Sequence, residues 1–507
     1  MNKKLCKTEL VRALGLCLAM TAGAAFAQEA AEQPAAQTEA QQLDTVTVRG
    51  FRQSLQYSTE AKRESTGFTD SIFAEDIGKF PDTNIAESLT RIPGIQLARD
   101  VNGEGLNIGI RGLGNSFTKT TINGASVATA SIGLDATNQN REVDLNLFPT
   151  EFFNQLTVYK SPVASLPEGG AAGVVDMRNM RPFDLPGGTH MTYSLQADYN
   201  DVASKTSPRG SFIGSWTNDA GTFGVLAGVT SSRGKLGVEG YETIGWTNPN
   251  LTNAQCGAGG DPAGFPEVGT PCNRNGGNGW RIPDVVPDNP STIAAGLTPG
   301  QVIDRDWLLQ HNPGLDVEQL GEALIPRLGR PVHMSGDRDR DAFLGSVQWR
   351  PTENTEFYVD VLYAKAHRTN DRIDLNLIGR NGNIIPLDMK VDANNVVTSA
   401  TFTNAQFFLE ARPYREDVQY WHITPGGTFW FNDGNAKLDV QANMSRSWMF
   451  RESPTILFNS PFTTLQYTND GGIPRWTTDL DLNDPNLGWT WDGGGRVWAP
   501  RNYDGRY

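Results

Sequence analysis

The chain has 507 residues, and 57 acidic against 43 basic side chains give it a net charge of −14. Its length exceeds one compact domain, and its acidity argues against nucleic acid as a partner. Beyond the first residues no segment holds 18 consecutive apolar residues, so helical membrane spans are not expected. The 54 glycines, few cysteines and 9% aromatic residues favour a β-rich exported protein.

Residues 1–27 have the parts of a secretory signal peptide. Four basic side chains fall within the first twelve residues, Ala13 to Ala22 is mostly apolar, and Ala25-Phe26-Ala27 forms an A-x-A cleavage site. The apolar stretch is shorter than the roughly 20 residues of a spanning helix, which disfavours a membrane anchor. The signal carries four basic residues and one acidic residue, so its removal takes the net charge from −14 to −17.

Only Cys256 and Cys272 remain once the signal peptide is removed. Two cysteines close together in an exported chain predict one disulfide that closes a loop. A loop of about fifteen residues closed in this way gains roughly 3 kcal/mol in the chain-entropy model. Two free thiols are the alternative.

Residues 28–57 are predicted to form a flexible leader. The segment 28–42 is rich in Gln, Glu and Ala and contains no branched apolar residue, so it cannot build a core. The stretch LDTVTVRG at 43–50 then alternates Thr and Val like a short β-strand. A tethered, unpaired strand is suited to add to the sheet edge of another protein. An ordinary first strand of the next domain is the alternative.

Residues 58–184 are predicted to form a small α/β domain. Asp82 is a good N-cap for a helix whose apolar stripe is Ile85, Leu89 and Ile92, and Pro93-Gly94 ends it. Short strand-like runs follow, with Gly-rich connections between several of them: 95–97, 106–111, 120–122, 156–159 and 174–177. The stretch GIRGLGNSF lacks the end of a phosphate-binding loop and is interpreted as tight turns.

Several blocks in this region, in register and in order, carry a family resemblance. They are DTVTVRG, AESLTRIPGIQL, NIGIRGLGNSFTKTTINGASV and LTVYKSPVASLPEGGAAGVVDMRNMRPFD, which together cover residues 43–184. They resemble the energy-coupling box and plug domain of TonB-dependent outer-membrane receptors, in particular a proteobacterial subfamily often linked to glycans. The resemblance implies that Asp44, Thr45, Val46, Thr47 and Val48 form a TonB box. It also implies an outer-membrane location in a Gram-negative bacterium and a plug inside a barrel of 22 strands.

The sequence after residue 189 has the features of a transmembrane β-barrel. Spanning strands need about 9–11 residues that alternate between lipid-facing and lumen-facing side chains. Seven alternating runs fit: 191–199, 210–216, 222–230, 343–349, 357–364, 419–431 and 438–448. Tight turns at 217–221, 350–354 and 432–435 contrast with long irregular segments, the first from about Lys235 to Arg340. A soluble β-sandwich is the alternative.

Tryptophans recur at one phase of this pattern. Trp216, Trp349 and Trp430 each stand just before a tight turn, which predicts one aromatic girdle at a membrane interface. The final stretch VWAPRNYDGRY contains Pro500 and little alternation, so it is not expected to be a closing strand. Only about seven strands fit, whereas plugged transporters use about 22. We therefore expect a fragment: signal peptide 1–27, leader 28–57, α/β plug 58–184, and the first part of an antiparallel barrel at 189–507.

Candidate ligand contacts are polar and aromatic. The plug connections 99–104 and 128–141 lack core-forming patterns and are placed by the resemblance at the outward end of the domain. With a later loop they supply these candidate substrate-binding residues: Asp100, Asn102, Asp135, Asn138, Asn140, Arg141, Trp489, Trp491 and Asp492. Aromatic rings among Asp and Asn favour an oligosaccharide, although loop tryptophans are as often structural. The DRDRD stretch at 337–341 is interpreted as a solvated loop base.

These features favour TonB-dependent import of a polar substrate, with TonB and its inner-membrane energising complex as partners and outer-membrane lipid as the surroundings. A ferric-siderophore receptor of the same fold is the alternative. A signal-transducing receptor needs a further domain before the box, and a passive porin needs neither box nor plug. No enzyme constellation, metal site or cofactor is expected, because the five His form no metal-binding pattern.

Overall fold

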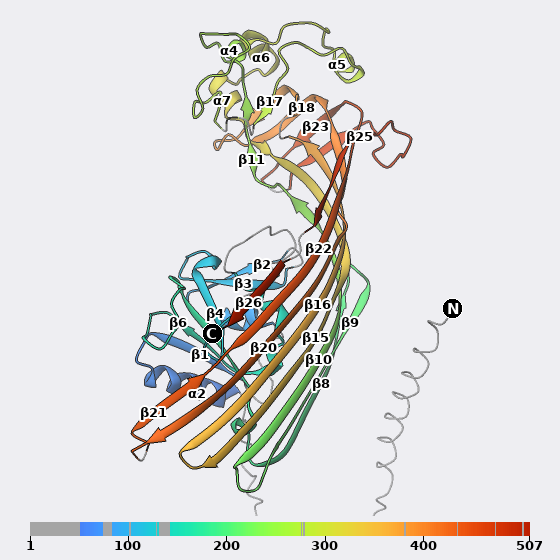
Figure 1. The fold of residues 1–507 in the computed structure, drawn as a ribbon. Helices are drawn as coiled ribbons and strands as arrows, with labels where there is room; N and C mark the ends of the chain where they lie inside the picture. Colours follow the sequence, from blue (N-terminus) through green and yellow to red (C-terminus); the bar gives the residue numbers. More distant parts are fainter. Residues whose placement is uncertain are drawn as a thin grey trace, which may run out of the picture. The chain divides into compact units, whose positions relative to one another are not determined.

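The computed structural model describes most of the chain after residue 50. The described residues are 51–74, 84–100, 103–127, 129, 130, 142–274, 276, 279–379, 382–432, 434–471, 473–498 and 501–506. The predicted signal peptide and the predicted TonB box, Asp44 to Val48, lie outside them. Within the described residues, a small mixed domain precedes a large antiparallel sheet (Figure 1).

The small domain is built on a five-stranded sheet of order β1-β6-β7-β4-β5. Its strands are β1 (Thr69–Phe73), β4 (Thr118–Ile122), β5 (Ala125–Ser126), β6 (Phe153–Tyr159) and β7 (Gly173–Asn179). Strands β4 and β7 run parallel and the other pairs antiparallel. Strands β2 (Ile95–Arg99) and β3 (Gly105–Ile110) form a separate hairpin. The predicted α/β character of this region, and each strand-like run predicted in it, is confirmed.

The helix predicted after residue 82 is shorter than expected. Helix α3 spans Ile85–Leu89, and Asn84 caps it by accepting hydrogen bonds from the next turn, including Ala86 N–H at 2.8 Å. Asp82, the predicted cap, lies outside the described residues. The stripe of Ile85, Leu89 and Ile92 is buried, as the spacing predicted.

One further helix, α2 (Phe51–Glu64), precedes the sheet. The predicted boundary between leader and plug, at residue 57, falls inside this helix and remains a prediction. Among the described residues no helix is long and apolar enough to cross a membrane.

The second sheet, which we call the wall sheet, contains eleven strands within the described residues. Its strands are β8 (Gly188–Asn200), β9 (Lys205–Thr217), β10 (Phe223–Glu242), β15 (Leu328–Thr352), β16 (Thr355–Ile378), β19 (Phe407–Ala411), β20 (Tyr414–Phe431), β21 (Ala436–Gln441), β22 (Met444–Asn459), β25 (Thr490–Trp498) and β26 (Arg501–Arg506). Every pairing is antiparallel. Figure 1 shows the long strands side by side.

Side chains alternate between the two faces of the wall sheet. On β16 the even-numbered residues from Glu356 to Asn376 are buried toward the small domain. The opposite face, which we call the outward face, carries a broad band of exposed apolar side chains: Met191, Tyr193, Leu195, Phe212, Val225, Val229, Phe343, Val347, Phe357, Val359, Tyr363 and Ile423. A soluble protein rarely exposes so continuous an apolar surface, whereas a membrane barrel turns such a band toward lipid.

From β9 onward, tight turns and long connections alternate along the wall sheet, as predicted. Tight turns join β9 to β10, β15 to β16 and β20 to β21, and the connections from β10 to β15, β16 to β20 and β22 to β25 are long or contain further elements. Strand β8, before them, is joined to β9 by the short connection 201–204. The strands, however, extend well beyond their predicted ends. Strand β10 continues to Glu242 and β15 begins at Leu328, inside a segment predicted as irregular. An apolar pattern did not reveal these extensions, because their few apolar side chains, such as Leu236, Val332 and Met334, are separated by charged residues and glycines.

The predicted aromatic girdle is right for two tryptophans and wrong for the third. Trp216 and Trp349 lie on the outward face, 44% and 51% exposed, and the rings of Trp349 and Phe357 stack at 5.8 Å. Phe357 pairs with Gly427, so the residue in phase on β20 is Phe429, whose ring lies 5.8 Å from Phe357. Trp430, one position later, lies on the other face of the sheet from Phe429, because adjacent residues of a strand point to opposite faces.

The last residues also differ from expectation. Strands β25 and β26, on either side of Pro500, both pair with β22. Counted together as one interrupted strand, they are the eighth long strand of the wall sheet, whereas the sequence predicted about seven strands. The interruption between β25 and β26 and the run Gly493-Gly494-Gly495 hide the alternation, since glycine supplies no side chain to mark a face.

The long connections between wall strands fold together. Within the described residues they contain a four-stranded sheet, β17 (Ile385–Val391), β18 (Val397–Ala405), β23 (Thr463–Thr468) and β24 (Arg475–Thr478). They also contain four short helices: α4 (Asn253–Cys256), α5 (Pro290–Ala294), α6 (Arg305–His311) and α7 (Val317–Gly321). One apolar core joins these pieces. We call this assembly the distal subdomain.

Candidate functional site

The small domain packs against the wall sheet through a mixed apolar and charged interface. Phe152 of the small domain, Ile213 and Leu226 of the wall sheet, and Tyr420 of β20 belong to one buried cluster. The Phe148 ring meets the Tyr420 ring edge-on at 5.1 Å. Edge-on aromatic pairs stabilise such contacts by about 0.5–1.5 kcal/mol beyond the area they bury.

Acidic side chains of the small domain meet arginines of the wall sheet at three points. Asp100 lies 3.0 Å from Arg338 on β15, and Asp144 lies 2.6 Å from Arg368 on β16. These four side chains are each at most 7% exposed. In a site with so little water, removal of one partner costs far more than the pair contributes to stability.

The third pair joins Glu151 to Arg209 on β9. Three hydrogen bonds of 2.6, 2.7 and 3.0 Å run from Arg209 to the two carboxylate oxygens of Glu151. This fork-like geometry fixes orientation as well as charge. Nearby, Arg340 donates to the Asn146 carbonyl oxygen at 2.9 Å and is attracted by the Glu104 carboxylate.

The Asp144–Arg368 pair continues into a network within the wall sheet. Arg368 also donates to Glu416 on β20 at 3.0 Å. Glu416 accepts two further hydrogen bonds from Arg451 on β22, at 2.6 and 3.0 Å, and one from the Tyr414 hydroxyl at 2.8 Å. A carboxylate of the small domain is thereby coupled to three adjacent strands.

A contact of opposite polarity lies nearer the tight turns. Here the acid belongs to the wall sheet: Asp360 on β16 is fully buried and lies 2.7 Å from Arg181 of the small domain. The amide of Asn123 and the hydroxyl of Ser346 also donate to Asp360. The Arg181 guanidinium lies 3.6 Å from the centre of the Tyr358 ring, a cation–π contact that adds to the ion pair.

Away from the wall sheet, Asp70 on β1 binds two lysines. Lys160 donates to one oxygen of its carboxylate at 2.6 Å and Lys62 to the other at 2.7 Å. Burial by itself raises the pKa of Asp70, but hydrogen bonds and charge attraction from Lys160 and Lys62 outweigh it, and the net pKa is lowered. Asp70 therefore stays ionised and ties α2 to the sheet.

The predicted ligand residues that the structure describes are not brought together into one site. Asp100 points into the interface with Arg338 rather than toward a ligand. Trp489 donates its indole N–H to the Asp484 carbonyl at 3.2 Å. The Trp491 side chain is 62% exposed, and its ring contacts the Phe458 ring. Asp492 is exposed. The remaining candidates, Asn102, Asp135, Asn138, Asn140 and Arg141, lie outside the described residues.

Most loop tryptophans in the described part of the chain are structural. Trp280 and Trp307 are buried in the core of the distal subdomain, 0% and 4% exposed, and Trp476 packs against that core. Only Trp246, at 41%, and Trp491 retain large exposed faces. The buried rings cannot act as stacking platforms for a sugar.

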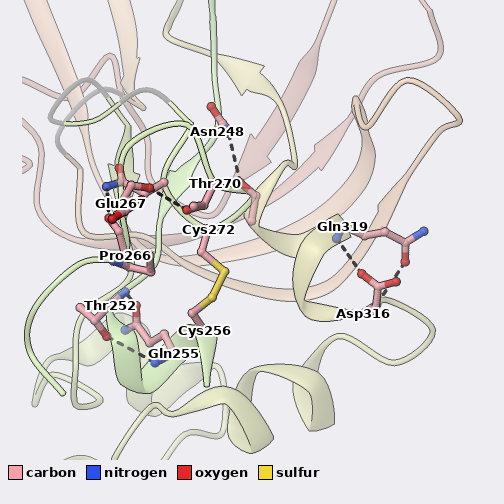
Figure 2. The surroundings of a disulfide bond; sticks show 12 residues. Asn248, Thr252, Gln255, Cys256, Pro266, Glu267, Thr270, Cys272, Asp316 and Gln319 are labelled. Carbon is pink, nitrogen blue, oxygen red and sulfur yellow. Dashed lines mark hydrogen bonds between the residues drawn. A yellow bond between two sulfur atoms is a disulfide. The ribbon is translucent and has the colours of Figure 1, made fainter. Parts of the chain in front are cut away.

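Figure 2 shows how Cys256 and Cys272 are joined within the distal subdomain. Cys256 ends α4, whose capping residue Thr252 and third residue Gln255 satisfy each other's backbone groups. Cys272 is 3% exposed and forms part of the apolar core. The disulfide therefore fastens a helix end to the core, in the long segment where the sequence placed it.

The interpretation of DRDRD as a solvated loop was wrong. Residues 337–341 lie in the middle of β15, with Arg338 and Arg340 turned toward the small domain. Asp337 and Asp341 point the other way and pair with Lys235 and Arg233 of β10. The strict alternation of sign was itself a period-two strand signal, which the search for apolar residues overlooked.

Comparison with known proteins identifies the small domain. Residues 61–175 match the family model described as the TonB-dependent Receptor Plug Domain. The small domain is thus similar to the plug domain of TonB-dependent receptors, and we call it the plug. Receptors with this domain are outer-membrane proteins of Gram-negative bacteria, and the outward apolar band agrees with that location. No curated protein sequence matches the chain.

Several solved structures with some similarity are described as receptors or transporters. The unliganded ferric citrate transporter FecA is 12% identical, matches 88% of this chain and 60% of its own, and gives a TM-score of 0.30. The siderophore receptor PirA from Acinetobacter baumannii is 13% identical, with 83% and 59% covered and a TM-score of 0.29. The chain spans about 60% of the length of these proteins. Such TM-scores carry no argument about function.

Among the described residues no group of three or more His, Cys, Asp or Glu side chains is placed to hold a metal ion. The paired charges and hydrogen bonds of the interface can separate and form again without covalent change.

Proposed function

We propose that this chain acts in energy-coupled import of a polar solute across the outer membrane, with the plug as the movable element. The observation that carries the proposal is the interface itself. The plug meets the wall sheet through a mixed interface, in which several buried ion pairs that can separate and form again lie beside apolar contacts. An interface made of apolar side chains alone would leave two exposed apolar surfaces, which tend to associate, when the plug separated from the wall sheet.

The force for opening would come through the strand at Asp44 to Val48. A free strand that pairs with TonB gains main-chain hydrogen bonds along its length, and the pull would pass through the leader into α2. Helix α2 is tied to β1 by Lys62 and Asp70, so tension would reach the plug sheet directly. The domain limits 1–27, 28–57, 58–184 and 189–507 belong to this proposal.

For the substrate we propose an oligosaccharide, with a ferric siderophore as the second candidate. The exposed Trp491 beside the carboxylate of Asp492 supports a sugar contact, since an apolar ring face stacks on a sugar while oxygens bind its hydroxyls. The proposed site also includes Asp100, Asn102, Asp135, Asn138, Asn140, Arg141 and Trp489. The second candidate, a ferric siderophore, is the alternative that the family resemblance leaves open.

The decisive experiment is Val46→Pro, measured as uptake of the receptor's substrate by living cells. Proline removes a main-chain donor from the strand, so uptake should fall to background while binding of substrate to the cell surface persists. Gln41→Pro is the matched control: it lies in a leader that already contains Pro34 and should leave uptake unchanged. Full uptake by Val46→Pro would mean passive flux and would exclude energy coupling.

A further inference from the structure

The arginines that face the plug gather on one patch of the wall sheet. Arg209, Arg338, Arg340 and Arg368, which we call the wall arginine cluster, come from three strands. Arg338 and Arg368 pair directly across β15 and β16, and both Arg209 and Arg340 pair with Ser232 of β10. Arg340 lines the same cavity as Arg209 and Arg338.

This arrangement is unfavourable for the wall sheet alone. Like charges directly opposite on neighbouring strands repel each other, and here the repulsion occurs at buried positions where water screens little. Yet the sequence places four cations together. What balances them is almost entirely the plug.

Three arginines of the cluster form ion pairs with plug carboxylates, and Glu104 of the plug lines the same cavity as the fourth, Arg340. Asp100 serves Arg338, Asp144 serves Arg368 and Glu151 serves Arg209, all at 2.6–3.0 Å. Glu104 attracts Arg340. Within the wall sheet Glu416 also compensates Arg368, but it is shared with Arg451. When the plug withdraws, four carboxylates leave and the cluster faces the opened path.

Space for a small anion already exists beside the cluster. A cavity of about 300 Å³ is lined by four cations, Arg209, Lys235, Arg338 and Arg340, by two carboxylates, Glu104 and Asp198, and by neutral residues that include Ser207 and Ser232. The serines add neutral hydrogen-bond donors. A solute that carries carboxylate, sulfate or similar groups would find guanidinium forks matched to its oxygens.

From this geometry we infer that the wall arginine cluster is a transit site for an anionic solute, whose negative groups replace the plug carboxylates as the plug withdraws. The inference rests on the proposed function and sharpens it: the cargo is an acidic oligosaccharide or an anionic iron chelate, not a neutral sugar. The opened path would then admit anions in preference to cations.

The test is charge selectivity of the opened pore, measured without TonB. The receptor is purified from its native host, placed in a planar bilayer, and its plug is loosened with urea. A reversal potential in a KCl gradient should show chloride several-fold more permeant than potassium. Equal permeation of the two ions, or preference for potassium, would overturn the inference while leaving the proposed function intact.

A variant should remove this selectivity and a matched one should not. Asp100→Asn, Arg338→Gln, Asp144→Asn and Arg368→Gln together neutralise two pairs without leaving an unpaired charge, and should bring the permeability ratio close to unity. The control is Arg233→Gln with Asp341→Asn, an exposed pair 2.9 Å apart on the outward face of β10 and β15, which should change nothing. Unaltered selectivity in the fourfold variant would contradict the inference.

Pore block of the unmodified receptor provides a measurement that needs no variant. Galacturonic acid oligomers and ferric citrate are the anionic probes, and galactose oligomers of equal length are the neutral one. Block by either anionic probe at lower concentration than by the neutral probe supports the inference, and the stronger of the two indicates the source of the charge. Equal block by all three would refute it.

Discussion

The plug interface combines buried ion pairs with apolar contacts, whereas the distal subdomain is closed by an apolar core and a disulfide. Buried ion pairs such as Asp144–Arg368 and Asp360–Arg181 join the plug to the wall sheet. The distal subdomain instead closes over an apolar core that includes Trp280 and Phe402, and a disulfide crosses it. Apolar burial and a covalent bond favour permanence, whereas buried ion pairs add little net stability but strongly fix one geometry.

The difference suggests a division of labour within one chain. The proposed function requires a plug position that is defined but can be given up, and the paired charges provide the orientation at that interface. The distal subdomain lies in segments that an outer-membrane protein would expose to the exterior, where an oxidised disulfide persists. Three experiments can break or sharpen this contrast.

The largest effect is expected from Arg368→Met. Methionine preserves much of the side-chain volume but leaves the buried carboxylate of Asp144 without its cation and Glu416 with one fewer. Breaking a buried pair in this way costs about 3–5 kcal/mol. The plug should therefore detach at lower urea concentration, measured as trypsin sensitivity of the plug during a urea titration, while the distal subdomain stays protease-resistant.

Lys437→Met is the control for that variant. Lys437 pairs with Asp439 at 3.0 Å on β21, but both side chains are about half exposed, and exposed pairs contribute only about 0–1 kcal/mol. Equal urea midpoints for the two variants would show that the buried pairs do not hold the plug.

A smaller and differently located effect is expected from Cys256→Ser with Cys272→Ser. Loss of a cross-link over a sequence separation of 16 residues should destabilise the distal subdomain by about 3 kcal/mol in the chain-entropy model. Proteolysis of that subdomain should accelerate, and the urea midpoint of plug release should not move. Mass spectrometry of unreduced peptides from the parent protein checks the bond; two alkylatable thiols there would refute it.

The smallest effect is a pH dependence of α2 docking. The folded-state pKa of Asp70 is lowered, because attraction from Lys160 and Lys62 exceeds the opposing effect of burial. Its contribution is therefore present above the ordinary carboxyl pKa of about 3.9 and is lost as pH falls through the lower folded value. Hydrogen exchange of α2 should accelerate over that acidic range, and Asp70→Asn should abolish the change. An unchanged acid profile in Asp70→Asn would assign the effect to another group.

Sequence patterns succeeded where one periodicity dominated. The strands of the plug and the alternation of short turns with long connections in the wall sheet were predicted from local signals alone, and the stripe of Ile85, Leu89 and Ile92 is buried as expected. They failed where the pattern was polar or interrupted. The DRDRD stretch alternates in the sign of its charge rather than in hydropathy. Pro500 and three glycines interrupt the alternation of side chains along β25 and β26.

Register and charge pairing were decided by tertiary structure. The face of the wall sheet on which Trp430 lies depends on the register between β16 and β20, because a shift of one residue moves a side chain to the other face. No local signal links Asp144 to Arg368, which are 224 positions apart. Local patterning thus determined which segments form strands and which family blocks they carry. Long-range packing alone decided which charges meet, because ion pairs between distant segments leave no periodic trace in the sequence.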